Sequence, residues 1–457
     1  MKVASTTKIN RSDINEYKND RQKRVMSPIE AEHRSRFLYG NVSTSLRMQT
    51  QRSKHLKARR SFSPVPAPKP LTANTSGASG FWHLLKKSFV SHFRKIDFLF
   101  LALIIFVGLI GVVAVHSGSL TDPYHRRIDF LQMFCFLIGI FAVVILPVID
   151  LSSLLNRWRL ILTVNVILLI ITLIFGYSPT GEENKSWINL GFTSIQPAEF
   201  SKVLFILSLS AHLEKIRDRL NSFIPLISIL LHGGLIIGLV LAEKDWGNTL
   251  VFIVIFVVML FCAKLDLRYI FGCIAAVVAI FPVIWEHLGE FRKKRVLIGF
   301  NPELDPQGYG HQVIRSRNAI ASGGLFGQGY LNGETIQRPG ALFAQHTDMV
   351  FAVIGQEFGF VGCAVLIVSY ALLITKIITI TGKSRDYSGT YICCGVAGMF
   401  IFQFIINIGM ALGISPVVGI TLPLVSYGAS SLICMYGALA LVMTVYANSK
   451  NYSYRSI

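Results

Sequence analysis

Asp348 stands at a boundary in the sequence, because the polar residues His346 and Thr347 precede it and a long apolar run follows it. A carboxylate at such a boundary can take a proton from a hydroxyl group and so act as a general base. It can also do no more than stabilise a helix start through the helix dipole. The residues alone leave both interpretations open. Glu357, about 13 Å further along a helix, is expected to pair with another helix in a structural role.

Glu199 and Lys202 form a second polar feature, in the stretch QPAEFSK at the head of another apolar run. Pro197 suits the first turn of a helix, where a missing N–H costs nothing. Residues three apart share one helix face, so the carboxylate and the ammonium are expected side by side. They form either a structural ion pair inside a bundle or two walls of a polar cavity.

Two further polar stretches interrupt the apolar pattern. Asp245, in the turn EKDWGNT, can cap the helix that follows it or belong to the same cavity. In GITLPLVSYGASS, Pro423 and Gly428 interrupt a helix, and Ser426 and Ser430 can satisfy the freed backbone groups or allow close helix packing.

The elements that must position these residues are membrane-spanning helices. The chain has 457 residues, of which 52% are hydrophobic and 15% charged, whereas soluble domains have about 25% charged residues. Apolar runs of this length predict helices, because barrel strands are far shorter. We therefore expect an all-α, polytopic membrane protein with about ten spans, at approximately 96–117, 129–149, 158–177, 197–213, 222–242, 245–263, 268–288, 348–375, 389–413 and 421–447.

Charge predicts the orientation of the spans. Residues 1–95 contain about 20 Lys and Arg against about five Asp and Glu, which indicates a disordered, basic cytoplasmic tail. An even number of spans also puts residues 448–457 in the cytoplasm. The tail is either a plain topological signal or a docking segment for anionic lipid or a cytosolic partner. No aromatic or motif context supports nucleic acid binding.

A large outer loop, residues 289–347, is expected between the seventh and eighth helices. Its basic residues include Arg295 and Arg315, which are either tolerated surface charge or a surface that meets an anion such as a phosphate. The seven cysteines lie in or beside apolar runs without metal-ligand spacing, so no metal site is predicted from them.

Four stretches together resemble one known family, the SEDS proteins of shape, elongation, division and sporulation. The resemblance spans about residues 96–447, and its segments NPELDPQG and NIGM are more similar to the RodA-type elongation members than to the FtsW-type division members. The four stretches are WINLGFTSIQPAEFSK, RVLIGFNPELDPQGYGHQVIRSRNAIASGGLFGQG, HTDMVFAVIGQEFGFVG and NIGMALGISPVVGITLPLVSYGASS.

The resemblance implies ten helices and a peptidoglycan glycosyltransferase that polymerises lipid II during cell elongation in the bacterial cytoplasmic membrane. It implies a class B penicillin-binding protein, a transpeptidase, as partner. Asp348 matches the family's catalytic aspartate, Glu199 and Lys202 its cavity pair, and Trp187 its functionally sensitive tryptophan. His346 and Thr347 would then lie beside the lipid headgroup, and Lys202 and the loop arginines would stabilise negative charge. Whether a divalent cation takes part is left open.

Three other functions stay open on the sequence. A multi-span bundle with a polar cavity also suits a flippase for lipid II, and a scaffold would need only to recruit its transpeptidase. A division or sporulation role is the third alternative.

Overall fold

The computed structural model describes residues 95–455 apart from 179–183, 192–193, 341 and scattered positions between 270 and 288. The expected tail therefore lies outside the described residues except for Lys95, and the expected seventh span, 268–288, lies largely outside them. The other nine expected spans each coincide with a helix. These helices are α4 (Phe98–Ser119), α5 (His125–Ile145), α7 (Trp158–Phe175), α8 (Pro197–Ile216), α9 (Phe223–Ala242), α10 (Trp246–Cys262), α14 (Val350–Lys383), α15 (Tyr387–Leu412) and α16 (Ala429–Arg455).

Within the described residues, seven helices are long and apolar enough to cross a membrane, which makes this a multi-pass membrane protein. Of the two other long helices, α10 is shorter, and α8 carries Glu199 and Lys202 in its first two turns. Shorter elements connect them: η2 (Leu146–Val148), α6 (Leu151–Asn156), β1 (Ile188–Asn189), β2 (Ser194–Ile195), η3 (Arg217–Arg219), α12 (Glu290–Phe300), η4 (Pro302–Leu304) and α13 (Tyr309–Ser322). The outer loop 289–347 is thus substantially helical.

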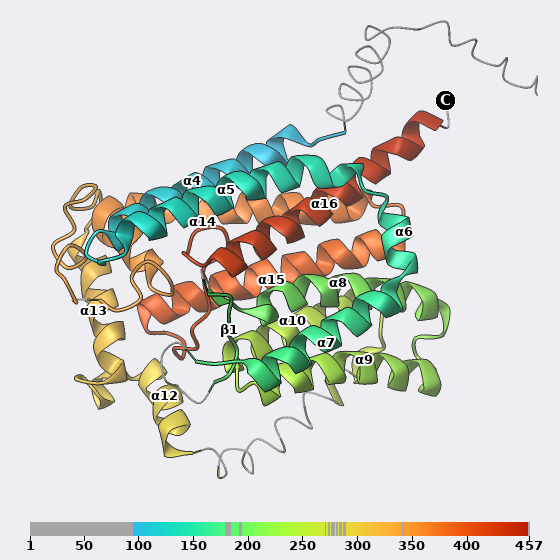
Figure 1. The fold of residues 1–457 in the computed structure, drawn as a ribbon, viewed down its shortest axis with the longest axis horizontal. Helices are drawn as coiled ribbons and strands as arrows, with labels where there is room; N and C mark the ends of the chain where they lie inside the picture. The colour runs from blue at the N-terminus through green and yellow to red at the C-terminus, as the bar shows by residue number, and fades with distance from the viewer. Residues whose placement is uncertain are drawn as a thin grey trace, which may run out of the picture. The chain divides into compact units, whose positions relative to one another are not determined.

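Helix α16 lies at the centre of the bundle, packed against α5, α8 and α15 (Figure 1). Of its most apolar window, 78% is buried, against 22% for α7, which lies at the periphery. Glycines let the neighbouring backbones approach α16, as is common in membrane bundles. A Cβ at Gly139 of α5 would lie 2.2 Å from the Tyr436 ring, and one at Gly108 of α4 would also meet Tyr436.

Helix α14 is broken at Gly359, whose φ of 64° and ψ of −160° are not helical. The broken turn does not lose its backbone hydrogen bonds, because residues 324–329 of the outer loop pair with it. Four bonds make this junction: Gln328 N to Gln356 O (2.9 Å), Gly329 N to Glu357 O (3.1 Å), Phe360 N to Gly324 O (2.9 Å) and Val361 N to Leu325 O (3.1 Å). An interrupted membrane helix is tolerated where other protein groups satisfy its backbone in this way.

Glu357 lies at this break and is almost completely buried. Ser117 of α4 donates a hydrogen bond to its carboxylate, and Gln337 of the outer loop donates another at 3.3 Å. The expected contact of Glu357 with another span is therefore present. The side chain ties α4, α14 and the outer loop together.

The break should depend on the absence of a side chain at residue 359. A Cβ at Gly359 would lie 2.3 Å from Gly327 N, and its φ and ψ lie in a region that is essentially restricted to glycine, which costs another residue about 1–3 kcal/mol. We expect Gly359→Ala to lower the unfolding temperature of the purified protein. Gly382→Ala, on the same helix with open space around the new Cβ, is the control and should not. Equal unfolding temperatures for the two variants would contradict the account of the junction.

The turn between α9 and α10 buries an acid. Glu243, the residue after α9, is 1% exposed, and among the described residues neither of its carboxylate oxygens has a hydrogen-bond partner. Its main-chain oxygen accepts from Lys185 N at 3.2 Å, which ties the turn to the segment before β1. Burial, together with the nearby Asp245 carboxylate, raises the pKa of Glu243 from 4.5 to about 8.

This raised pKa makes stability depend on pH. Between pH 4.5 and about 8 the folded protein holds a proton on Glu243 that the unfolded chain releases, so stability falls as pH rises through this window. Glu243→Gln mimics the protonated form. We expect the variant to match the parent near pH 5 and to unfold at a higher temperature at pH 8–9. Glu214→Gln, at an exposed glutamate, should follow the parent throughout, and a parent-like pH curve for Glu243→Gln would refute the prediction.

Candidate active site

The main chain at His346, Thr347 and Asp348 is hydrogen-bonded to neighbouring parts of the chain. Each of the three consecutive carbonyl oxygens accepts a hydrogen bond from α15 or from the segment 413–428 that follows it. The three bonds are Tyr427 N to His346 O (2.8 Å), Ser426 Oγ to Thr347 O (2.5 Å) and Asn407 Nδ2 to Asp348 O (2.9 Å). The backbone that carries Asp348 is therefore fixed on one side along its length.

The Asp348 carboxylate is half-buried over Gly419. A Cβ at Gly419 would be 3.6 Å from Asp348 Oδ2, and Gly419 has a φ of 70°. Asp348 is not the N-cap of α14, because Met349 occupies that position and no side chain caps the helix. Asp348 therefore makes no capping hydrogen bond with its side chain, although the helix dipole still favours a negative charge there.

Glu199 and Lys202 are paired as their spacing predicts, with Lys202 Nζ 2.7 Å from Glu199 Oε2. Lys202 is fully buried and Glu199 is 5% exposed. Their helix, α8, packs against α7, α15 and α16, so the pair lies within the bundle. Burying two charges is costly unless they compensate each other closely, as they do here.

Asp245 joins the N-terminal ends of three helices. Its carboxylate accepts from Asn248 N (3.0 Å), which caps α10, and from Gln196 Nε2 (2.6 Å) at the N-cap of α8. Gln196 N in turn donates to Ser430 Oγ (3.2 Å) in the first turn of α16. Capping by Asp245 is therefore observed, and burial raises the pKa of its carboxyl. The positive ends of three helix dipoles converge here, an arrangement that favours anions.

The junction around Asp245 adjoins the Asp348 region through the segment 413–428. A Cβ at Gly247, in the first turn of α10, would be 2.6 Å from Val418 O, the residue before Gly419. Trp187 directly precedes the hairpin β1–β2, which leads into α8. It is half-buried, and its backbone pairs with that of Tyr177.

Helix α13 brings basic residues to the same segment. Ser316 Oγ donates to Ala411 O (2.8 Å) and anchors α13 on the end of α15. Half-buried Arg315 adjoins this anchor, and exposed Arg317 lies against Gly413, where a Cβ would be 3.2 Å from its Cδ. Arg295 belongs to α12, but its side chain lies outside the described residues.

The remaining predicted residues have mainly local roles in this structure. The His346 ring packs edge-on against Tyr427 with centroids 5.6 Å apart, and burial lowers its pKa, which favours the neutral ring. Thr347 Oγ1 donates within its own turn to Ala344 O at 3.2 Å.

No roles were predicted from the sequence for Asn407 and Gln196. A polar residue inside the apolar run around NIGM was nevertheless a signal for Asn407.

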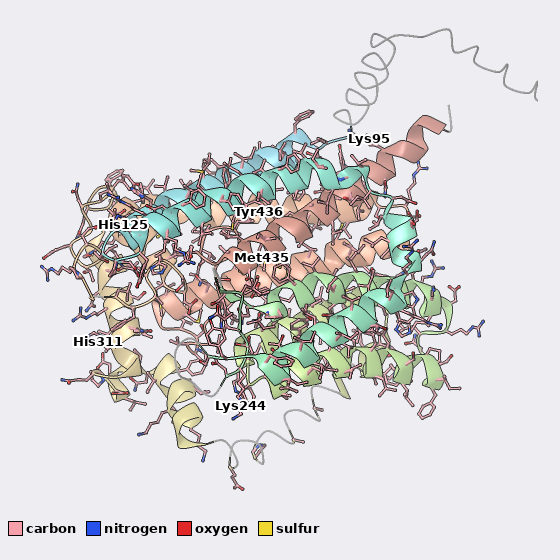
Figure 2. The ribbon with its side chains drawn as sticks, viewed as in Figure 1. Lys95, His125, Lys244, His311, Met435 and Tyr436 are labelled. Carbon is pink, nitrogen blue, oxygen red and sulfur yellow. The ribbon has the colours of Figure 1, made fainter. Side chains whose placement is uncertain are left out.

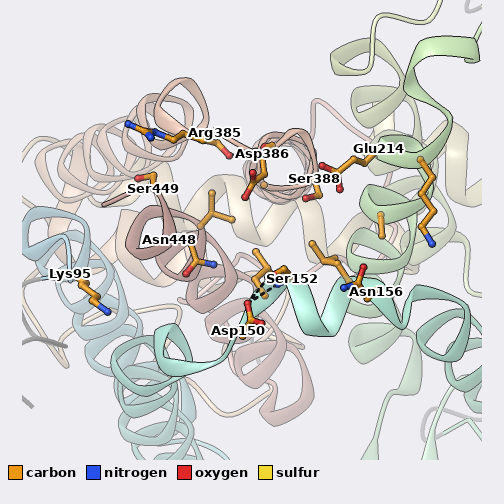
Figure 3. A pocket seen from close by; sticks show the side chains of 17 residues that line it. Lys95, Asp150, Ser152, Asn156, Glu214, Arg385, Asp386, Ser388, Asn448 and Ser449 are labelled. Carbon is orange, nitrogen blue, oxygen red and sulfur yellow. Dashed lines mark hydrogen bonds between the residues drawn. The ribbon is translucent and has the colours of Figure 1, made fainter. Parts of the chain in front are cut away.

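A polar cavity of about 530 Å³ lies at the other end of the helices and contains none of these residues. Figure 2 shows Lys95, which lines it, and His311 of α13 at opposite ends of the bundle. Acidic and basic side chains both surround the cavity (Figure 3), among them Asp150, Glu214 and Arg385. Among the residues that the structure describes, no group of three or more His, Cys, Asp or Glu is placed to hold a metal ion.

Comparison with known proteins shows which chains this one is similar to. The chain is 32% identical to the probable peptidoglycan glycosyltransferase FtsW of Trichlorobacter lovleyi, over 80% of this chain and 97% of that one. It is 34% identical to the peptidoglycan glycosyltransferase MrdB of Escherichia coli, over 62% and 76% of the two chains. A solved peptidoglycan synthase complex that coordinates polymerization and crosslinking contains a chain with a TM-score of 0.67 and 28% identity, covering 78% of this chain and 98% of that one.

Division-type and elongation-type relatives both occur among these similar proteins. The family model described as cell cycle protein, FtsW/RodA/SpoVE, matches residues 94–451. Because that match covers nearly all of the helical bundle, the chain belongs to the FtsW/RodA/SpoVE family, as the sequence resemblance indicated.

Proposed function

We propose that this protein is a peptidoglycan glycosyltransferase that polymerises lipid II, with Asp348 as its general base. The observation that carries the assignment is the fixed backbone at Asp348, whose three consecutive carbonyls are held while the carboxylate stays half-buried over Gly419. A general base has to be held within hydrogen-bond reach of the proton that it removes. The names of the relatives support the reaction class.

In the proposed reaction, the acceptor sugar's 4-hydroxyl oxygen attacks the anomeric carbon of the donor. The hydroxyl proton passes to the Asp348 carboxylate, a new C–O bond forms, and the bond from the anomeric carbon to the lipid diphosphate breaks. A single displacement inverts the configuration at that carbon. The departing diphosphate is already a good leaving group, so stabilisation of its charge is the remaining requirement.

Two features are suited to that stabilisation. Arg315 and Arg317 lie on α13, which is anchored beside the segment 413–428. The N-terminal ends of α8, α10 and α16 meet at Asp245 nearby, and helix N-termini favour phosphate groups. Trp187, which directly precedes the hairpin that leads into α8, offers an aromatic surface for the substrate.

The cellular role and topology follow from the same proposal. Lipid II is polymerised at the outer face, so Asp348 lies outside and the N- and C-termini lie in the cytoplasm of a bacterial membrane, as the basic tail predicts. The RodA-type segments favour a role in cell elongation. A class B penicillin-binding protein is the proposed transpeptidase partner, in keeping with the solved complex that coordinates polymerization and crosslinking.

The buried ion pair of Glu199 and Lys202 allows a test that distinguishes a structural role of the pair from a role in the reaction. Removing Glu199 alone leaves a buried unpaired ammonium, at a cost of about 3–5 kcal/mol, so we expect Glu199→Ala to lose more activity than Lys202→Ala. The double variant Glu199→Leu with Lys202→Met removes both charges and should restore the unfolding temperature. If the pair serves the reaction, this double variant is stable but inactive in glycan polymerisation. A stable and fully active double variant would show that the pair is only structural.

Asp348→Asn tests the general base directly. Asn keeps the size and the backbone contacts but cannot accept the acceptor proton, so we expect polymerisation to fall about 100-fold or more. The assay is gel-resolved glycan made from lipid II by the purified protein with its transpeptidase partner. Asp305→Asn, another half-buried outer-loop acid, is the control. Normal product from Asp348→Asn would reject the base assignment and favour lipid II flipping, which a vesicle transport assay would then measure.

A further inference from the structure

Asn407 of α15 is fully buried, and its amide nitrogen bridges two main-chain carbonyls. Nδ2 donates to Asp348 O at 2.9 Å and to Ile420 O at 2.8 Å, which uses both of its hydrogens. The two bonds also define the orientation of the amide, because a flipped amide would place Oδ1 against two carbonyl oxygens. The side chain is therefore held in one arrangement.

The two carbonyls belong to the two chain segments that meet at the Asp348 carboxylate. One is the peptide of Asp348, and the other immediately follows Gly419, over which the Asp348 carboxylate lies. The single amide thus sets the separation between the residue that bears the carboxylate and the backbone beneath that carboxylate. Ser426 and Tyr427 hold the preceding two carbonyls, so Asn407 is the contact made to the Asp348 peptide itself.

We infer that Asn407 is a positioning residue for the general base, acting through the Asp348 backbone and not on the substrate. This inference rests on the proposed function of Asp348. Displacing a reacting group by about 1 Å can slow an enzyme about 100-fold without weakening substrate binding. Loss of the bridge should therefore lower kcat and leave KM for lipid II nearly unchanged.

Asn407→Asp is the sharpest test, because it keeps the volume and replaces the donor with a carboxylate that faces two carbonyl oxygens. Gln403→Glu is the matched control. Gln403 lies one turn earlier on the same helix and is 1% exposed, and none of its described hydrogen bonds reaches residues 346–348. Both variants convert a buried amide on α15 to an acid, but of the two residues Asn407 is the one whose amide bridges Asp348 O and Ile420 O.

The measurements are kcat and KM in lipid II polymerisation, with unfolding temperature and co-purification of the transpeptidase partner. We expect kcat to fall about 100-fold in Asn407→Asp, with KM within about twofold, and to fall far less in Gln403→Glu.

Two results would overturn the inference: an unchanged kcat in folded Asn407→Asp, or an equal loss of kcat in Gln403→Glu. If Asn407→Asp fails to accumulate in membranes, Asn407→Ser, which keeps one donor, is judged by the same kcat and KM criteria. Asp348→Asn assayed in parallel separates the two proposals. An inactive Asp348→Asn with a fully active Asn407→Asp rejects only the positioning role, whereas an active Asp348→Asn rejects the base itself.

Discussion

Backbone groups inside a bilayer have no water to bond with, and this constraint shapes every irregular part of the structure. Where α14 breaks at Gly359, residues 324–329 of the outer loop supply the missing partners. Where the chain enters α14 at Asp348, α15 and the segment after it supply them. The polar side chains at these places first satisfy the main chain. A reactive group can stand there because its backbone is already held.

The same constraint explains where the proposed chemistry lies. Helix ends are the points at which uncompensated N–H groups and dipoles occur, and the ends of α8, α10, α14 and α16 meet around the segment 413–428. A site that binds a diphosphate and positions a base needs both features close together. The cavity at the opposite end has balanced charge and none of these converging helix starts, so its size does not make it the reaction site.

The buried acidic and basic side chains are stabilised in different ways. Glu199 and Lys202 compensate each other at 2.7 Å, Oε1 of Glu357 accepts hydrogen bonds from the neutral donors Ser117 and Gln337, and Glu243 stays protonated over much of the physiological range because its pKa is raised. An uncompensated charge in such surroundings costs several kcal/mol, which excludes unpaired ionised groups. Asp348 is only half-buried, and this partial exposure suits a carboxylate that has to stay ionised until it receives a proton.

Local rules in the sequence determined the helical class, the bounds of most spans, the i,i+3 pairing of Glu199 with Lys202 and the capping by Asp245. Each of these depends on residues within a turn or a span of one another, and hydrophobic periodicity and helix geometry act over that range. Motif resemblance added Asp348 as the proposed reactive group. Only the tertiary structure decided that Asp348 does not cap α14, that the outer loop folds into helices and fills the break, and that Asn407 holds Asp348 from 59 residues away. Such contacts join residues that are far apart in the sequence, and no repeating pattern of residues marks them. They can therefore be identified only in the packed structure.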